Sequence, residues 1–173
     1  MSETKPQSDQ SPESDIEIPS FTIDMDRAAV SKAVIDLEPE ALVQFWASFQ
    51  PTAEVLFPSV ATGRTADDFA AVLSGSKPAT ILLEHDFDDP LIDAIIGTLS
   101  TEEFDKLPSA MAVDGFGGEK FFIGTQDSVD TLASLYEGRG TEELPADASF
   151  HRGVGEAVGY PSWAIDEFIT KPE

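Results

Sequence analysis

The sequence contains no cysteine, which excludes disulfides, thiolate catalysis and any zinc or iron–sulfur site built on cysteine ligands. Histidine is almost as scarce, with 2 residues in 173. No Gly-x-Ser-x-Gly motif is present, so no pattern indicates a serine nucleophile beside a base. A glycosidase-type pair of carboxylates stays open, although nothing in so acidic a sequence singles one out.

Basic residues are the next deficit. The chain carries 10 Lys and Arg against 33 Asp and Glu, which gives a formal net charge of −23. Contacts to phosphates require a basic surface, and anionic lipids repel an acidic protein. We therefore expect no nucleic-acid partner and no membrane partner, whereas a protein partner remains open.

Long hydrophobic runs are also missing. No stretch approaches the roughly 18 apolar residues that a membrane-spanning helix requires. The first residues, Met-Ser-Glu-Thr-Lys-Pro-Gln, do not join a basic region to an apolar one, as a secretory signal would. We therefore expect a cytoplasmic protein.

Three explanations compete for the acidity: mimicry of nucleic acid, binding to a basic partner, and adaptation to high salt. A mimic concentrates its acids on one face, whereas here the acids are spread along the whole chain. Self-repulsion destabilises a compact acidic domain in dilute buffer, and molar salt reduces the Debye length to about 3 Å. The composition is typical of a halophilic, haloarchaeal cytosolic protein.

The polarity of the sequence changes near residue 20. Residues 1–19 hold almost nothing apolar before Ile16, so they cannot offset the entropy of ordering and are predicted to form a disordered acidic tail. Residues 20–173 are predicted to form a single α+β domain, with helices packed on a small, partly antiparallel sheet of three or four strands.

Apolar periodicity predicts where the helices and strands lie. Apolar residues three and four positions apart indicate seven helices or helical faces, namely Met25–Asp36 capped by Asp24, a helix from Pro39 that buries Leu42, Phe45 and Trp46, a short helix capped by Thr65 and ended at Gly75, Leu91–Leu99, Gln126–Glu137, Phe150–Val158, and a last helix opened by Pro161. A further short helix capped by Ser100 or Thr101 is expected. A short apolar run at Ala79–Leu83 indicates a buried strand. Two further runs, Ala110–Val113 and Lys120–Ile123, lie on either side of a glycine-rich turn and indicate a β-hairpin.

The segment His85-Asp86-Phe87-Asp88-Asp89 follows the first strand. One imidazole and three carboxylates within five residues match the ligands of a hard divalent ion, so His85, Asp86 and Asp88 are candidate metal ligands for an assisted hydrolysis. The structural alternative is an acidic loop in which Asp88 or Asp89 caps the helix that begins near Pro90. Apart from this divalent metal, no cofactor is expected.

Two other patterns are weaker. His151 and Arg152 are expected to open the penultimate helix, where a helix N-terminus can bind an anion; the alternative is an exposed pair with Arg152 bridging to an acid. Gly153, Gly155 and Gly159 are spaced almost as in a dinucleotide-binding turn, but no strand precedes them, as that geometry requires.

The most specific local motif is Gly159-Tyr160-Pro161. It predicts a fixed corner between two helices, with a left-handed glycine ending the first helix and proline starting the second. Within residues 155–168 this motif resembles the C-terminal signature of an uncharacterised archaeal family, which reads Gly-Tyr-Pro-Glu-Cys-Cys at its centre. Trp163 and Ala164 stand where that family has cysteines. The resemblance implies kinship but carries no activity.

Three functions follow from these patterns. The leading hypothesis is a non-enzymatic interaction or regulatory module, because no catalytic constellation is assembled in the sequence. The alternatives are a metal-assisted hydrolase that uses His85, Asp86, Asp88 and His151, and an acidic partner or decoy for a basic protein.

The net charge of −23 leads to the first prediction, that folding requires salt, because self-repulsion is screened only at high ionic strength. As KCl is lowered from molar to millimolar concentration, we expect cooperative unfolding in circular dichroism. An unchanged spectrum and melting temperature across that range would contradict salt adaptation.

Overall fold

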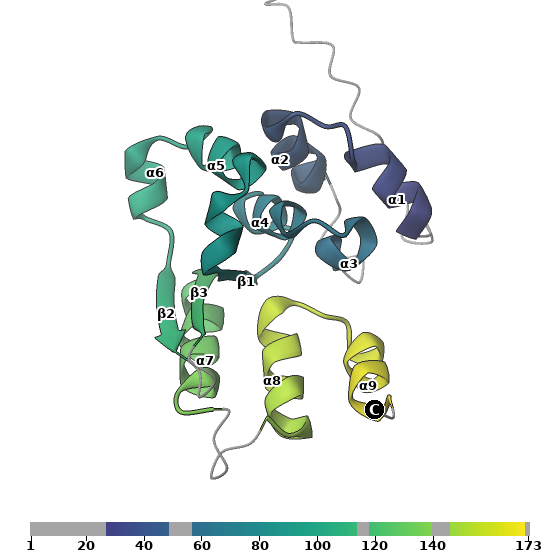
Figure 1. Cartoon of the computed structure of the whole chain (residues 1–173), viewed down its shortest axis with the longest axis vertical. Helices are drawn as coiled ribbons and strands as arrows, with labels where there is room; N and C mark the ends of the chain where they lie inside the picture. Colours follow the sequence, from purple (N-terminus) through teal and green to yellow (C-terminus); the bar gives the residue numbers. More distant parts are fainter. Residues whose placement is uncertain (1–26, 49–56, 114–117, 140–145, 172–173) are drawn as a thin grey trace, which may run out of the picture.

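The computed structural model describes residues 27–48, 57–113, 118–139 and 146–171. These residues form helices arranged around a small antiparallel sheet (Figure 1), which confirms the predicted α+β class. The predicted tail, residues 1–19, lies outside them. Within the described residues, no helix is both long and apolar enough to cross a bilayer.

Four helices form the N-terminal part of the described chain: α1 (Arg27–Val34), α2 (Pro39–Ser48), α3 (Pro58–Thr62) and α4 (Thr65–Leu73). Helix α2 begins at Pro39 as predicted, and Leu42, Phe45 and Trp46 are fully buried. Helix α4 is almost entirely buried, including its two acids. Helix α4 packs on β1 and β3, α2 and α3 contact α4, and α1 contacts α3.

The sheet has three strands in the order β1-β3-β2, namely β1 (Ala79–Leu83), β2 (Ser109–Val113) and β3 (Glu119–Gly124). Both pairings are antiparallel, so the predicted hairpin is confirmed, although its turn at residues 114–117 is not among the described residues. Between β1 and β2 the chain forms the 3-10 helix η1 (Glu84–Asp88), α5 (Pro90–Gly97) and α6 (Thr101–Asp105). Ser100 caps α6 through a reciprocal pair of hydrogen bonds with Glu103.

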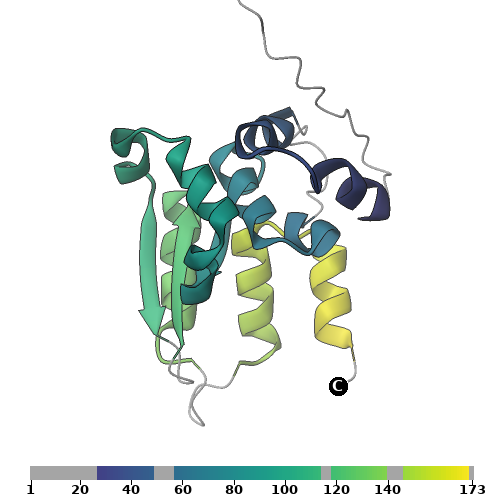
Figure 2. The same cartoon turned by 45° about the horizontal axis from the view of Figure 1, so that its top comes forward.

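Three helices complete the fold: α7 (Gln126–Tyr136), α8 (Ala148–Val158) and α9 (Ser162–Thr170). They stand in a row in Figure 2, with α8 between the other two. Helix α7 lies against the sheet, and α9 contacts α8. The C-terminal part of the chain is therefore a layer of helices on the other side of the sheet from α4 and α5.

The alternation of side chains along the strands joins the two layers. Leu82 and Ile123 belong to a hydrophobic cluster with α1, α2, α4 and α5. Ala79 and Phe122 belong to a second cluster with α7 and α8. Since successive strand residues point to opposite faces, one central strand, β3, supplies side chains to both clusters.

Several helix boundaries differ from the sequence-based predictions, including the following three. The first helix ends at Val34 rather than Asp36. Arg64, not Thr65, is the N-cap of α4, and Thr65 is its first residue. Pro161 is likewise the N-cap of α9 rather than its first residue. Each shift is one or two residues, because apolar periodicity indicates which face is buried more sharply than where a helix ends.

Candidate functional site

A cavity of about 330 Å³ opens between α8, α9 and α3. Its apolar walls come from all three helices and from the α8–α9 corner. We call it the α8–α9 groove and define it by its apolar lining residues Val60, Val154, Tyr160, Trp163, Ile165 and Phe168. A smaller hollow of about 40 Å³ is lined by Phe57 as well as by Val60, Tyr160 and Trp163, which also line the groove. The groove is concave and mostly apolar, as expected of a binding site.

Two glycines allow α8 to approach its neighbours closely. A Cβ atom on Gly153 would lie 2.9 Å from Leu135 Cδ1 on α7, and one on Gly155 would lie 2.7 Å from Ile165 Cγ1 on α9. Both glycines lie inside a helix, so they do not form the phosphate-binding turn that their spacing suggests. Their role is to let three helices pack side by side, which shapes the groove.

The corner between α8 and α9 has the conformation predicted for Gly159-Tyr160-Pro161. Gly159 is left-handed, with φ +92°, and it ends α8. The Tyr160 N–H donates to the Gly155 carbonyl at 2.8 Å. A Cβ atom on Gly159 would lie 2.6 Å from Pro78 Cδ. The corner is therefore in close contact with the residue that precedes β1.

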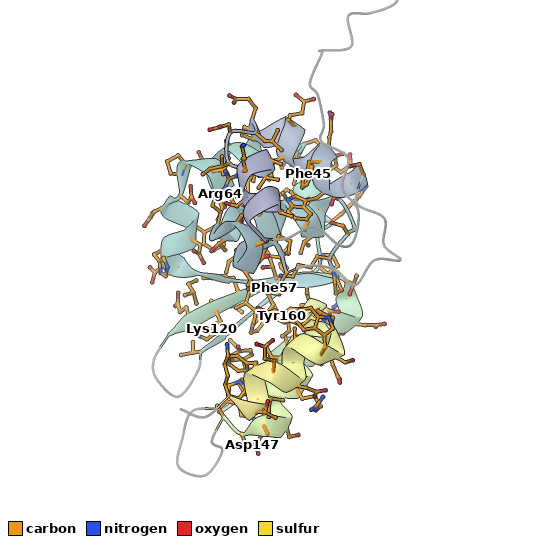
Figure 3. The ribbon with its side chains drawn as sticks, turned by 90° about the vertical axis from the view of Figure 1, so that its right-hand side faces the viewer. Phe45, Phe57, Arg64, Lys120, Asp147 and Tyr160 are labelled. Carbon is orange, nitrogen blue, oxygen red and sulfur yellow. The ribbon has the colours of Figure 1, made fainter. Side chains whose placement is uncertain are left out.

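Tyr160 connects the groove to a buried charge. Its ring stacks on Phe57 at 3.6 Å between centroids and 6° between planes, and the two side chains are adjacent in Figure 3, between α9 and the N-terminal helices. The Lys77 Nζ atom lies 3.5 Å from the Phe57 ring centroid. Such a cation–π contact is strongest where water is excluded, and Lys77 is fully buried at its side chain.

Lys77 also forms an ion pair with Asp68, at 3.3 Å between Nζ and Oδ2. The other Asp68 oxygen accepts a hydrogen bond of 2.8 Å from the Ser59 N–H. Burial lowers the pKa of the Lys77 amine to about 8, although the Asp68 carboxylate opposes this shift. Burial, with the nearby Asp68 charge, raises the pKa of the Tyr160 hydroxyl. The pair therefore joins α3 and α4 to the segment that precedes β1.

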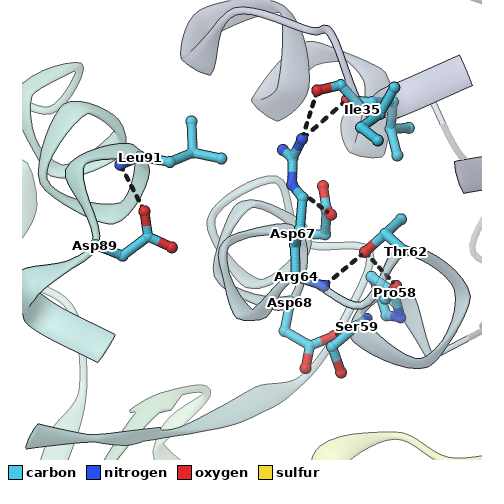
Figure 4. Close-up of polar contacts among 10 residues, drawn as sticks. Ile35, Pro58, Ser59, Thr62, Arg64, Asp67, Asp68, Asp89 and Leu91 are labelled. Atoms are coloured by element: carbon cyan, nitrogen blue, oxygen red, sulfur yellow. Dashed lines mark hydrogen bonds and ion pairs between the residues drawn. The ribbon is translucent and has the colours of Figure 1, made fainter. Parts of the chain in front are cut away.

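A second ion pair joins the start of α4 to the end of α1 (Figure 4). Arg64 Nε lies 3.2 Å from Asp67 Oδ2, and Arg64 Nη1 donates to the Ile35 carbonyl at 2.8 Å. Arg64 therefore pairs with a buried acid and caps the C-terminal end of α1. Burial raises the pKa of Asp67, against the opposing effects of Thr62 and Arg64.

The acidic segment after β1 has structural contacts. Asp86 Oδ2 accepts a hydrogen bond of 2.7 Å from the Leu83 N–H, and Asp89 caps α5 by accepting from the Leu91 N–H at 2.9 Å (Figure 4). His85 is mostly exposed, with Nε2 3.7 Å from Asp86 Oδ1, and Asp88 is exposed. Across the described residues, no three or more His, Asp or Glu side chains are grouped so as to hold a metal ion.

The predicted position of His151 and Arg152 is wrong. Helix α8 begins at Ala148 with Asp147 as its cap, so the His151 N–H already donates to the Asp147 carbonyl at 3.0 Å. Arg152 forms an exposed ion pair of 2.7 Å with Asp166 on α9, which is the alternative that the sequence left open. His151 lines the groove, whereas His85 does not.

Sequence reasoning missed Phe57, Asp68 and Lys77. One signal was present: Asp67 and Asp68 stand among apolar residues in a helix, and acids in such a stretch become buried and require a partner. No local pattern indicates that the partner is Lys77.

The chain matches no protein-family model, no curated protein and no solved structure. The resemblance of its C-terminal residues to an archaeal family therefore stays a prediction.

The corner gives a prediction about stability. Gly159→Ala should lower the free energy of unfolding by roughly 1–3 kcal/mol, because a side chain is strained at positive φ and would press on Pro78. Gly97→Ala is the matched control, since a Cβ atom there meets nothing within 4 Å. Urea unfolding in molar KCl measures both; equal effects would contradict this role for Gly159.

The buried amine predicts a pH dependence. Because the pKa of Lys77 falls from 10.5 to about 8 on folding, the unfolded chain binds more protons between these values, and stability rises with pH there. The gain is at most about 3 kcal/mol, and above pH 10 ionisation of Tyr160 in the unfolded chain opposes it. Urea titrations between pH 8 and pH 10 should show the rise in the wild type and a flat profile in Lys77→Met.

Proposed function

We propose that the chain is a non-enzymatic interaction module of a halophilic, haloarchaeal-type cytosol, and that its α8–α9 groove binds an amphipathic helix of a partner protein. The partner helix has apolar residues on the face that enters the groove and basic residues on its flanks. The observation that carries the proposal is the pair of exposed aromatic side chains, Trp163 and Phe168, that border an apolar cavity.

The distribution of exposed apolar side chains supports this site. Among the described residues, the large exposed ones fall into two patches, with Ile35 apart from both. One patch is Val60, Trp163 and Phe168, which all line the groove, and Phe168 is 64% exposed. Contiguous apolar patches with polar borders mark interaction sites, and aromatic residues in them carry much of the binding energy.

The shape of the groove favours a helix. One wall is a continuous stripe along α9, from Trp163 through Glu167 and Phe168 to Lys171, and the facing wall is His151, Val154 and Gly155 on α8. Helix α9 has nine residues and is therefore about 14 Å long. A groove of this length accommodates two to three turns of a helix, anchored at positions three and four residues apart.

The groups in the groove favour binding over catalysis. His151 contacts aromatic rings, with Phe150 and Phe168 each 5.3 Å away between centroids. A histidine that acts as a base is normally oriented by a hydrogen bond between its ring and a third group. Among the described residues, the neighbours of the His151 ring are the aromatic rings of Phe150 and Phe168 instead. Exposed acids on both helices, Glu156 and Glu167, are complementary to a basic flank.

The test uses a synthetic amphipathic helix of leucine and lysine as the probe, titrated into the full chain in molar KCl. We expect saturable binding that shifts the methyl signals of Val60, Val154 and Ile165 in NMR. Phe168→Asp should weaken binding at least tenfold, about 1.4 kcal/mol, because a charge then enters the apolar wall.

Ile35→Asp is the matched control, since Ile35 is also an exposed large apolar residue, 56% against 64% for Phe168, but lies outside both apolar patches. A second probe with glutamate in place of lysine should bind more weakly. Absence of saturable binding, or equal effects of the two aspartate variants, would contradict the site, and equal affinity for the two probes would contradict the basic flank.

A further inference from the structure

The second apolar patch lies on the hairpin, away from the groove. Strand β2 is an edge strand, because the sheet order is β1-β3-β2 and β2 pairs only with β3 in the described part of the chain. Its residues, Ser-Ala-Met-Ala-Val, alternate between exposed and half-buried. The other edge strand, β1, is mostly buried. The two edges of the sheet are therefore unequal, and β2 is the accessible one.

Edge strands are normally protected from pairing with other chains by lysine, other charges, proline or bulges. Residues 107–113, Leu-Pro-Ser-Ala-Met-Ala-Val, contain no charge, and the one proline precedes the strand. This edge lacks the usual protection against strand pairing.

An apolar surface extends from this edge across one face of the sheet. Met111 lies opposite Phe121 in the register of β2 and β3, and a cavity of about 280 Å³ there is lined by Phe87, Phe104, Leu107, Met111 and Phe121. Met111 and Val113 are more than half exposed, at 55% and 53%. On the opposite face of β2, Ala110 and Ala112 pack with the α7–α8 cluster. The unprotected edge therefore borders an apolar cavity into which side chains of another molecule can pack.

We propose that this surface, independently of the groove, joins two copies of the chain through antiparallel pairing of their β2 strands. The pairing is centred on Met111, with Ser109 of one copy opposite Val113 of the other, and it extends the two sheets into one of six strands. In a two-fold contact the same residues meet from both sides, so Met111 of each copy lies beside Met111 of the partner subunit.

Charge allows a second copy as the occupant of this surface. Residues 107–113 carry no charge, so two copies add no like-charge contact where their β2 strands meet, and molar salt screens the repulsion between the two acidic chains at longer range. Five paired residues bury too little area alone, since stable interfaces bury about 1,200–2,000 Å². The apolar side chains of Phe87, Phe104, Met111 and Val113 supply the additional contact.

The absence of cysteine from the chain permits a positional test. In an antiparallel pair, opposed Cα atoms lie about 4.5–5.5 Å apart, which suits a disulfide. Oxidation of Met111→Cys in molar KCl should yield a covalent dimer at least tenfold faster than oxidation of Ile35→Cys. The control is matched in exposure, since Ile35 is 56% exposed, follows the last residue of α1 and lines neither the groove nor the cavity beside β2.

Sedimentation in molar KCl gives a second, independent measurement. The wild type should have twice the chain mass of 18.6 kDa, and Met111→Lys should be monomeric, because two lysines would meet at the two-fold axis. Val113→Lys serves as a second variant should Met111→Lys lose its circular dichroism signal. A monomeric wild type, equal oxidation rates for the two cysteine variants, or a folded dimer in both lysine variants would overturn the proposal. Dimerisation that is lost in Phe168→Asp instead would place the contact at the groove and overturn it equally.

Discussion

The close contact between Gly159 and Pro78 decides how the C-terminal helices sit on the sheet. Only a residue without a side chain can adopt the left-handed turn and leave room for the proline ring. This contact sets Tyr160 on Phe57, and Phe57 in turn covers the Lys77 amine. The position of α9, and with it the groove, depends on this sequence of contacts more than on any exposed ion pair, such as that of Arg152 with Asp166, which contributes at most about 1 kcal/mol.

The two buried ion pairs also change the surface. Lys77 is fully buried and Arg64 is largely so, although the chain has only 10 basic residues. The cations that neutralise Asp67 and Asp68 are therefore not available to neutralise acids outside. On such a surface, an uncharged apolar patch is where a second acidic chain can approach without adding like-charge contacts. The proposed contact at β2 uses a patch of this kind, whereas the groove combines an apolar wall with acids that attract a basic helix.

Much of the fold was predictable because it depends on local patterns. Pro39 and the spacing of Leu42, Phe45 and Trp46 predicted α2, and two apolar runs about a glycine-rich turn predicted the hairpin. Predictions failed where a neighbouring residue competed for the same role. Asp147 caps α8, so the helix begins at Ala148, two residues before the expected Phe150. His151 therefore lies inside the helix and lines the groove instead of binding an anion at the helix end.

The sequence by itself determined the acidity, the lack of thiol chemistry, the order of helices and strands, and the left-handed corner at Gly159. Each of these depends on composition or on neighbours within a few residues. Tertiary structure alone decided that Lys77 pairs with Asp68 beneath Phe57 and Tyr160, that α8 and α9 enclose a groove, and that β2 rather than β1 is the accessible edge. These features join segments more than a hundred residues apart, such as Phe57 and Tyr160. Hydrophobic periodicity specifies which face of an element is buried but not which element covers it.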